Sequence, residues 1–153
     1  MNAATNVLAF LAVIRAGEGT SGPDGYRTLV GGGTFNSFED HPDIAVRIKT
    51  KEGYITSTAA GAYQIIIRTW EEIESAIDLP DFSPDSQDQA AIWLIGQCGA
   101  LADAQNGLLA SAVEKCNRTW ASLPGSPYGQ PTRTLAQAQA VFEQAGGVVS
   151  TSL

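Results

Sequence analysis

The sequence predicts an α+β protein that is mainly helical and carries one small antiparallel sheet. Apolar residues recur at helical spacing near the start of the chain and again over most of its second half. The stretch between them, residues 20–58, is rich in Gly, Pro, Asp and Thr and contains short runs of β-forming residues. The 153 residues are close to the length of one typical domain, so we expect a single domain spanning 1–153.

The first predicted helix begins at an N-cap formed by Asn2 or Thr5. Gly17 and Gly19 follow its last apolar residue, and glycine commonly ends helices. We therefore expect Glu18 to lie just past a helix C-terminus. The apolar residues of this helix are Val7, Leu8, Phe10, Leu11 and Ile14.

The small sheet is predicted within residues 20–58, between long loops. Its β-forming pieces are 26–30, 34–38 and 53–56. Five further helices are expected after it, starting with a long, mostly buried helix from Ser57 or Thr58 to Ile77. The others are a helix with Ser83 as N-cap and Pro84 at its first position, a short helix at 100–104, an amphipathic helix at 108–116, and a last helix capped by Thr134.

Charge and hydropathy exclude several classes of partner. The net charge of −7 argues against nucleic acid or an anionic membrane as the main partner, because both require clustered Lys and Arg. The apolar run from Val7 to Ile14 is far shorter than the roughly 20 residues of a membrane-spanning helix. No Lys or Arg precedes this run, so we expect neither a signal peptide nor a membrane anchor.

The residues available for chemistry are few. The one histidine, His41, lies in Asp40-His41-Pro42 and is expected to serve a turn or a hydrogen bond. No serine-hydrolase, P-loop, zinc-peptidase or dinucleotide motif occurs, and no metal site is expected. Cys98 and Cys116 are either free core thiols or a disulfide, and the sequence leaves both open. A carboxylate is the remaining candidate for catalysis.

Glu18 has a physical case as that carboxylate. The negative end of the preceding helix dipole and a partly desolvated position would both raise its pKa, which suits a general acid. The alternative is a solvated residue between two ordinary glycines.

Several segments in order resemble the bacteriophage lambda endolysin family, almost from end to end. They are 15–20 (RAGEGT), 26–33, 40–42 (DHP), 57–64 (STAAGAYQ), 81–84 (DFSP), 120–125 (WASLPG) and 128–130 (YGQ). The resemblance implies a lysozyme-like fold whose small sheet flanks the substrate groove. It also implies a lytic transglycosylase that cleaves the β-1,4 bond between N-acetylmuramic acid and N-acetylglucosamine for host cell lysis, without a cofactor. Glu18 falls on the family's catalytic glutamate.

The same resemblance implies the residues that bind substrate. These are Ser57, Thr58, Tyr63 and Gln64 in the 57–64 segment, and Tyr128 and Gln130 in the later loop. The alternative to substrate binding for Tyr63 and Gln64 is a place in the core of the protein. For the 127–131 loop the alternative is a rigid surface turn set by its prolines. Gly61 is expected to allow close packing near a helix start, and Trp120 to lie in the core.

Two other functions remain open at this stage. A hydrolytic lysozyme acting on the same bond would need a second carboxylate near Glu18, and the candidates are Asp24, Glu39, Asp40 and Glu52. A non-catalytic peptidoglycan-binding module could dispense with Glu18, so the presence of that residue counts against it. The acidic net charge departs from the basic character usual in the family.

The resemblance also implies where the protein works and with what. The expected partner is the peptidoglycan glycan strand, and a holin-type protein is expected to release the enzyme from the host cytoplasm to the periplasm at lysis. We expect it to act as a monomer, although the sequence does not determine the oligomeric state.

Overall fold

The computed structural model describes residues 2–128 and 132–150 of the chain. Within these residues it contains six α-helices, one short 3₁₀ helix and one two-stranded sheet, so the predicted α+β class is confirmed. The chain forms two compact units: unit 1 is Met1–Gly19 with Ala91–Leu153, and unit 2 is Thr20–Ala90. Helix α3 (Pro84–Gln97) begins in unit 2 and ends in unit 1. The expectation of a single domain stays a prediction.

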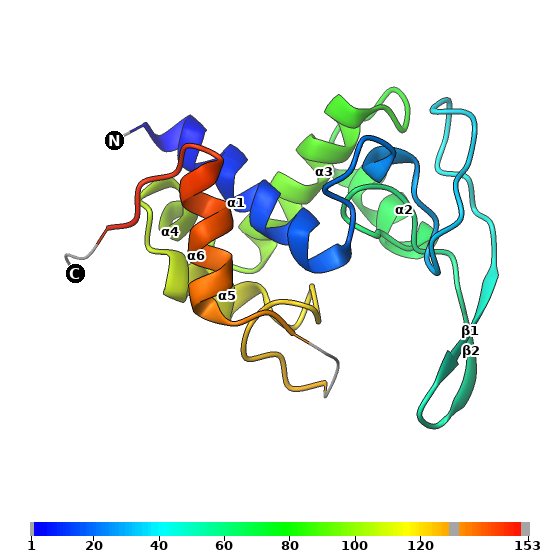
Figure 1. Cartoon of the computed structure of the whole chain (residues 1–153). Coiled ribbons are helices and arrows are strands. Elements are labelled where there is room, and N and C mark those ends of the chain that lie inside the picture. The colour runs from blue at the N-terminus through cyan, green and yellow to red at the C-terminus, as the bar shows by residue number, and fades with distance from the viewer. Residues whose placement is uncertain (1, 129–131, 151–153) are drawn as a thin grey trace. The chain divides into compact units, whose positions relative to one another are not determined.

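Unit 1 is helical. Besides the end of α3, its helices are α1 (Ala3–Glu18), α4 (Leu101–Gln105), α5 (Leu109–Cys116) and α6 (Leu135–Gln144) (Figure 1). Helix α1 packs against both α4 and α6. Its buried Asn6 donates from Nδ2 to the Gln105 carbonyl (3.0 Å) and accepts at Oδ1 from the Val148 N–H (2.9 Å). Both ends of this buried amide are therefore satisfied, and they tie α1 to two distant segments.

The helix ends in unit 1 follow the sequence signals closely. Asn2 is the N-cap of α1 and accepts from the Thr5 N–H, while Gly19 ends the helix with a left-handed φ of 75°. Thr134 caps α6, as predicted, and the structure adds a capping box with Gln137. One expectation was wrong by a residue: Glu18 is the last residue of α1 and does not lie past it.

Unit 2 packs around an aromatic cluster. Its elements are the 3₁₀ helix η1 (Gly25–Arg27), strands β1 (Val46–Thr50) and β2 (Gly53–Ser57), helix α2 (Ile67–Ala76) and the start of α3. The fully buried ring of Phe82 lies 4.7 Å from that of Trp70, 4.9 Å from that of His41 and 5.7 Å from that of Phe35 (centroid distances). These edge-on and tilted contacts give the small unit its apolar centre.

Strands β1 and β2 form an antiparallel hairpin that extends outward within unit 2 (Figure 1). The register pairs Val46 with Ser57 and Thr50 with Gly53, so Lys51 and Glu52 form the two-residue turn. The prediction of a strand at 53–56 is confirmed, but its partner β1 was not predicted. The signal was present in the alternation of Val46 and Ile48 with charged residues.

Two predictions for unit 2 were wrong. Residues 26–30 and 34–38 form no extended strand, only isolated bridges such as Thr28 with Thr34, because η1 and the turn at Gly31 and Gly32 interrupt them. The long helix from 57 or 58 begins only at Ile67. Gly61 (φ 83°) and Gln64 (φ 50°) are left-handed, which a right-handed helix does not permit.

Candidate active site

Glu18 is held at the C-terminal end of α1, where only part of its side chain meets solvent. Its Oε2 accepts a hydrogen bond from the hydroxyl of Ser122, 104 residues further along the chain but in the same compact unit. Ser122 follows the buried Trp120, which confirms the prediction that this tryptophan belongs to the core. The core residue thereby fixes the loop that presents Ser122.

Gly17 makes this contact possible. A Cβ added to residue 17 would lie 2.7 Å from the Ser122 Oγ, so any larger side chain would displace the hydroxyl. Gly17 was expected only to end the helix. In the structure it lies within α1 and leaves room for the serine.

Burial raises the pKa of the Glu18 carboxyl above its ordinary value, and the hydrogen bond from Ser122 partly opposes this shift. The position at the negative end of the α1 dipole acts in the same direction as burial. A carboxyl that keeps its proton closer to neutral pH can act as a general acid and afterwards as a base.

The segment 57–64 belongs to unit 2 and is shaped by buried hydrogen bonds. Gln64 donates from Nε2 to the carbonyls of Gly61 (2.8 Å) and Thr28 (3.1 Å). A Cβ at Gly61 would collide with the side chain of Gln87, and the Gln87 Oε1 accepts from the Ala62 N–H at 2.9 Å. The prediction that Gly61 serves close packing is confirmed, although no helix starts there.

Tyr63 is a core residue in this structure, with 1% of its surface exposed. Its hydroxyl donates to Asp88 Oδ1 (2.6 Å), which also accepts from the Tyr26 hydroxyl (2.8 Å). Burial, followed by these contacts with Asp88, raises the pKa of Tyr63. Tyr63 therefore fits the core alternative. The hydrogen bonds of Tyr63 and Tyr26 to Asp88 were not predicted from the sequence.

Ser57 and Thr58 use their hydroxyl oxygens to shape the same segment. The Ser57 Oγ accepts from the Ala59 N–H (3.1 Å), and the Thr58 Oγ1 accepts from the Ile67 N–H (2.9 Å) at the start of α2. Each hydroxyl keeps its own proton available for donation. Both side chains are half-buried.

The later loop places the Tyr128 side chain in solvent. The residue is 56% exposed, and its backbone N–H donates to the Ser126 Oγ at 3.4 Å. Gln130 lies outside the described residues. Tyr128 and Glu18 belong to unit 1, whereas Ser57, Thr58, Tyr63 and Gln64 belong to unit 2.

The four candidate second carboxylates are exposed residues of unit 2: Asp24, Glu39, Asp40 and Glu52. His41, as expected, has a hydrogen-bonding role. Its Nε2 donates to the Ile65 carbonyl (2.7 Å), because its Nδ1 accepts from the Asp43 N–H (3.0 Å). Burial lowers the pKa of this imidazole, which favours its neutral form.

Three absences concern only the part of the chain that the structure describes. No three His, Cys, Asp or Glu side chains gather there where they could hold a metal ion. No helix there is long and apolar enough to cross a membrane. Cys98 and Cys116 are free thiols in this structure and form no disulfide, which were the two alternatives left open by the sequence.

The chain is similar to known phage proteins in sequence and in fold. A family model described as endolysin matches residues 8–149. The endolysin of Escherichia phage lambda is 38% identical over 147 residues, covering 92% of this chain and 91% of that protein. The endolysin of Escherichia phage P2 is 37% identical over 161 aligned positions, covering 97% of each.

Two solved structures match the fold. The bacteriophage lambda lysozyme complexed with a chitohexasaccharide has a TM-score of 0.87 and 36% identity, over 95% of this chain and 97% of that chain. A second structure of the lysozyme from bacteriophage lambda has a TM-score of 0.84 with the same identity and coverage. The predicted lysozyme-like fold is confirmed.

Proposed function

Because this chain belongs to the endolysin family, we propose that it cuts peptidoglycan glycan strands by lytic transglycosylation, with Glu18 as acid and base. Family and fold make it a peptidoglycan-cleaving glycosidase of the phage type. The observation that carries the choice of residue is the partly buried Glu18 carboxyl, whose pKa is raised at the end of α1. The transglycosylase chemistry is the finer part of the proposal.

In the first step, protonated Glu18 donates its proton to the glycosidic oxygen between N-acetylmuramic acid and N-acetylglucosamine. The bond from that oxygen to C1 breaks through a state with oxocarbenium character. In the second step, the Glu18 carboxylate takes the proton of the muramoyl C6 hydroxyl, whose oxygen bonds to C1. The products are a free 4-hydroxyl and a 1,6-anhydro-muramoyl end, and Glu18 is protonated again.

This route needs no second carboxylate and no cofactor. The attacking hydroxyl is already part of the substrate, so its effective concentration is high. Ser122 stabilises the carboxylate between the steps through its hydrogen bond to Oε2, which leaves Oε1 of Glu18 for proton transfer.

We assign glycan contacts to the residues that the resemblance selected. The exposed Tyr128 ring is available to stack on a sugar, and Gln130 follows it in the same loop. Ser57 and Thr58 can donate their hydroxyl protons to the glycan. We assign a glycan contact also to Gln64, which is half-buried in the same 57–64 segment. For Tyr63 we propose an indirect contribution, because its hydroxyl binds Asp88 inside unit 2.

Hydrolysis is the competing reaction on the same bond. It requires a second carboxylate about 5 Å from the acid for retention, or about 6.5–9.5 Å for inversion. Digestion of purified peptidoglycan in oxygen-18 water separates the two reactions. Transglycosylation leaves unlabelled anhydro ends that borohydride does not reduce, whereas predominantly labelled, reducible ends would overturn the proposal.

Two variants test the assignment of the residues. Glu18→Gln keeps the side-chain size and removes the transferable proton, so we expect a folded protein whose lytic rate falls by orders of magnitude. Lysis within a few-fold of the unmodified protein would exclude Glu18 as the acid and indicate another acid. Absence of lysis by the unmodified protein itself would instead favour the non-catalytic module. Asp40→Asn should retain most activity, and loss of turnover in a stable Asp40→Asn protein would favour two carboxylates.

We further propose that the enzyme accumulates in the host cytoplasm as a monomer and reaches the periplasm through a separate holin-type protein. This proposal rests on the membership of the chain in the endolysin family. Cells producing the protein alone should keep growing until chloroform is added. Rapid lysis without chloroform would contradict this proposal.

A further inference from the structure

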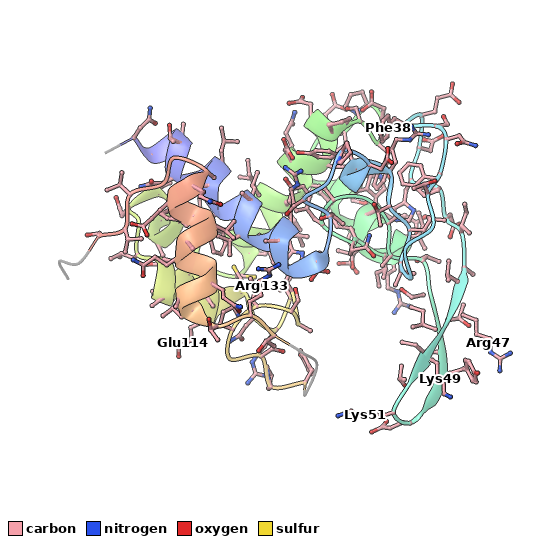
Figure 2. The ribbon with its side chains drawn as sticks, viewed as in Figure 1. Phe38, Arg47, Lys49, Lys51, Glu114 and Arg133 are labelled. Atoms are coloured by element: carbon pink, nitrogen blue, oxygen red, sulfur yellow. The ribbon has the colours of Figure 1, made fainter. Side chains whose placement is uncertain are left out.

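The cations of this acidic protein are unevenly distributed. Three of its nine Lys and Arg residues, Arg47, Lys49 and Lys51, fall within five consecutive positions of the β1–β2 hairpin. Glu52 is the one acidic residue between Val46 and Ser57, so the hairpin is locally positive in a chain of net charge −7. Figure 2 shows the three side chains spaced along the hairpin toward its tip.

The register gathers cationic and aromatic groups on one face of the hairpin. Arg47 pairs with Thr56 and Lys49 pairs with Tyr54, and directly paired residues point to the same side of a sheet. The Arg47 guanidinium carbon lies 4.1 Å from the centroid of the Tyr54 ring, whose residue is 58% exposed. This contact orders the guanidinium while leaving its edge open to an anion.

Folding does not account for these charges. In the described part of the chain, the structure pairs Lys115 with Asp103 but pairs none of the three hairpin cations with a carboxylate. Arg47, Lys49 and Lys51 are all exposed, and β1 and β2 are the whole of their sheet among the described residues. The three hairpin cations are therefore available to a partner.

We propose that the three cations of this hairpin bind the carboxylates of the peptide stems of peptidoglycan. The inference rests on the proposed function, which supplies the polymer: its glycan backbone is largely uncharged, whereas its stems carry free carboxylates. A short stem can bind the hairpin without contacting the rest of the protein, whereas an extended anionic surface would also face the net negative charge of the chain. The hairpin gives the acidic enzyme a local attraction to its substrate.

Binding to sacculi tests this inference, in a Glu18→Gln background so that the polymer stays intact. The hairpin variant is K49E/K51E, and the matched control is R68E/R118E, which makes the same charge change at two exposed residues elsewhere. Circular dichroism and thermal melting establish that both variants fold. Cosedimentation is measured with intact sacculi and with glycan from which an amidase has removed the stems, at low and high salt.

We expect K49E/K51E to bind intact sacculi at least about fivefold more weakly at low salt, with a smaller difference at high salt. Its binding to stem-free glycan should match that of the control, and the control should lose less than about twofold on sacculi. Equal losses in both variants, an equal loss on stem-free glycan, or no loss at all would each overturn the inference. Unchanged sacculus binding with lost binding to phosphatidylglycerol vesicles would identify a lipid surface as the partner instead.

The proposed function fails in a different way. If the unmodified enzyme releases no anhydro ends from sacculi or from stem-free glycan, transglycosylation is wrong whatever the hairpin binds. If it releases them from both and the hairpin variant binds sacculi normally, only the stem-binding inference is wrong.

Discussion

Replacing Ser122 with Ala should raise the pKa of Glu18. The serine hydroxyl donates to the Glu18 Oε2, and this bond stabilises the ionised carboxylate and opposes the effect of burial. Without the bond, the carboxyl holds its proton to higher pH. The substitution removes one oxygen from a half-buried side chain, so we expect the fold to be kept.

The size of the effect follows from the kind of bond. Hydrogen bonds to charged groups contribute about 1.5–3 kcal/mol, and about 1.4 kcal/mol corresponds to one pKa unit. Since Glu18 is partly exposed, solvent replaces some of the lost bond. The expected increase is therefore about one unit.

The assay is the pH dependence of kcat/KM on purified peptidoglycan. Because the first step uses protonated Glu18, activity declines as the free enzyme loses that proton, and the high-pH limb reports its pKa. In Ser122→Ala this limb should move to higher pH by about one unit. Ser75→Ala, which alters an exposed serine of α2, should leave it in place. A limb that stays fixed in Ser122→Ala, or that moves to lower pH, would refute the reasoning.

Three further predictions concern Gly17, the stability cost of ionising Glu18, and the two cysteines. Gly17→Ala should displace the Ser122 hydroxyl and shift the pH profile of kcat/KM to higher pH, as Ser122→Ala does. It should not bring the stability gain of roughly 0.5–1 kcal/mol that Gly→Ala usually gives within a helix. An unshifted profile with a higher Tm would contradict this. Because the pKa of Glu18 is raised in the folded state, the folded protein binds this proton more tightly than the unfolded chain does. The stability of the protein therefore falls as pH rises above the ordinary glutamate pKa of 4.5. Glu18→Gln should therefore melt higher than the unmodified protein at pH 7, by about 2–4 °C for each kcal/mol recovered, and thermal melts at pH 4 should show a smaller difference; a larger difference at pH 4 would be inconsistent. Hydrogen bonds from Cys116 and, to a smaller extent, from Thr119 lower the pKa of Cys98 to about 6. The hydrogen bond to Cys98, followed by burial, raises the pKa of Cys116. Iodoacetamide at pH 7 should consequently label Cys98 first in peptide mapping by mass spectrometry, and earlier labelling of Cys116 would show that the order is wrong.

Local signals predicted the helices well where the chain itself supplies the cap. Asn2 and Thr134 are N-caps in the structure because their side chains can reach backbone N–H groups three residues away. The same kind of reasoning failed between Thr58 and Ile67. There the apolar spacing is helical, but the left-handed backbone at Gly61 and Gln64 is stabilised by Gln87 and by the carbonyl of Thr28, which are distant in sequence.

The hairpin shows a second limit. Strand β2 was predicted from its β-forming residues. Strand β1 was not predicted, because it carries two cations, although its apolar residues alternate with polar ones. Pairing with β2 makes it a strand, because an isolated strand has no partner for its backbone hydrogen bonds. The unpaired charges that motivate the stem-binding inference become visible only once the register is known.

The sequence by itself determined the family resemblance, the α+β class and the selection of Glu18, because these depend on residue order and on local spacing. Only the tertiary structure decided how that carboxyl is tuned. It brings Ser122 to Glu18 across 104 positions, and it places Tyr63 in the core with its hydroxyl bound to Asp88. The physical reason is that burial and long-range hydrogen bonds are properties of the packed chain, and these are what shift a pKa.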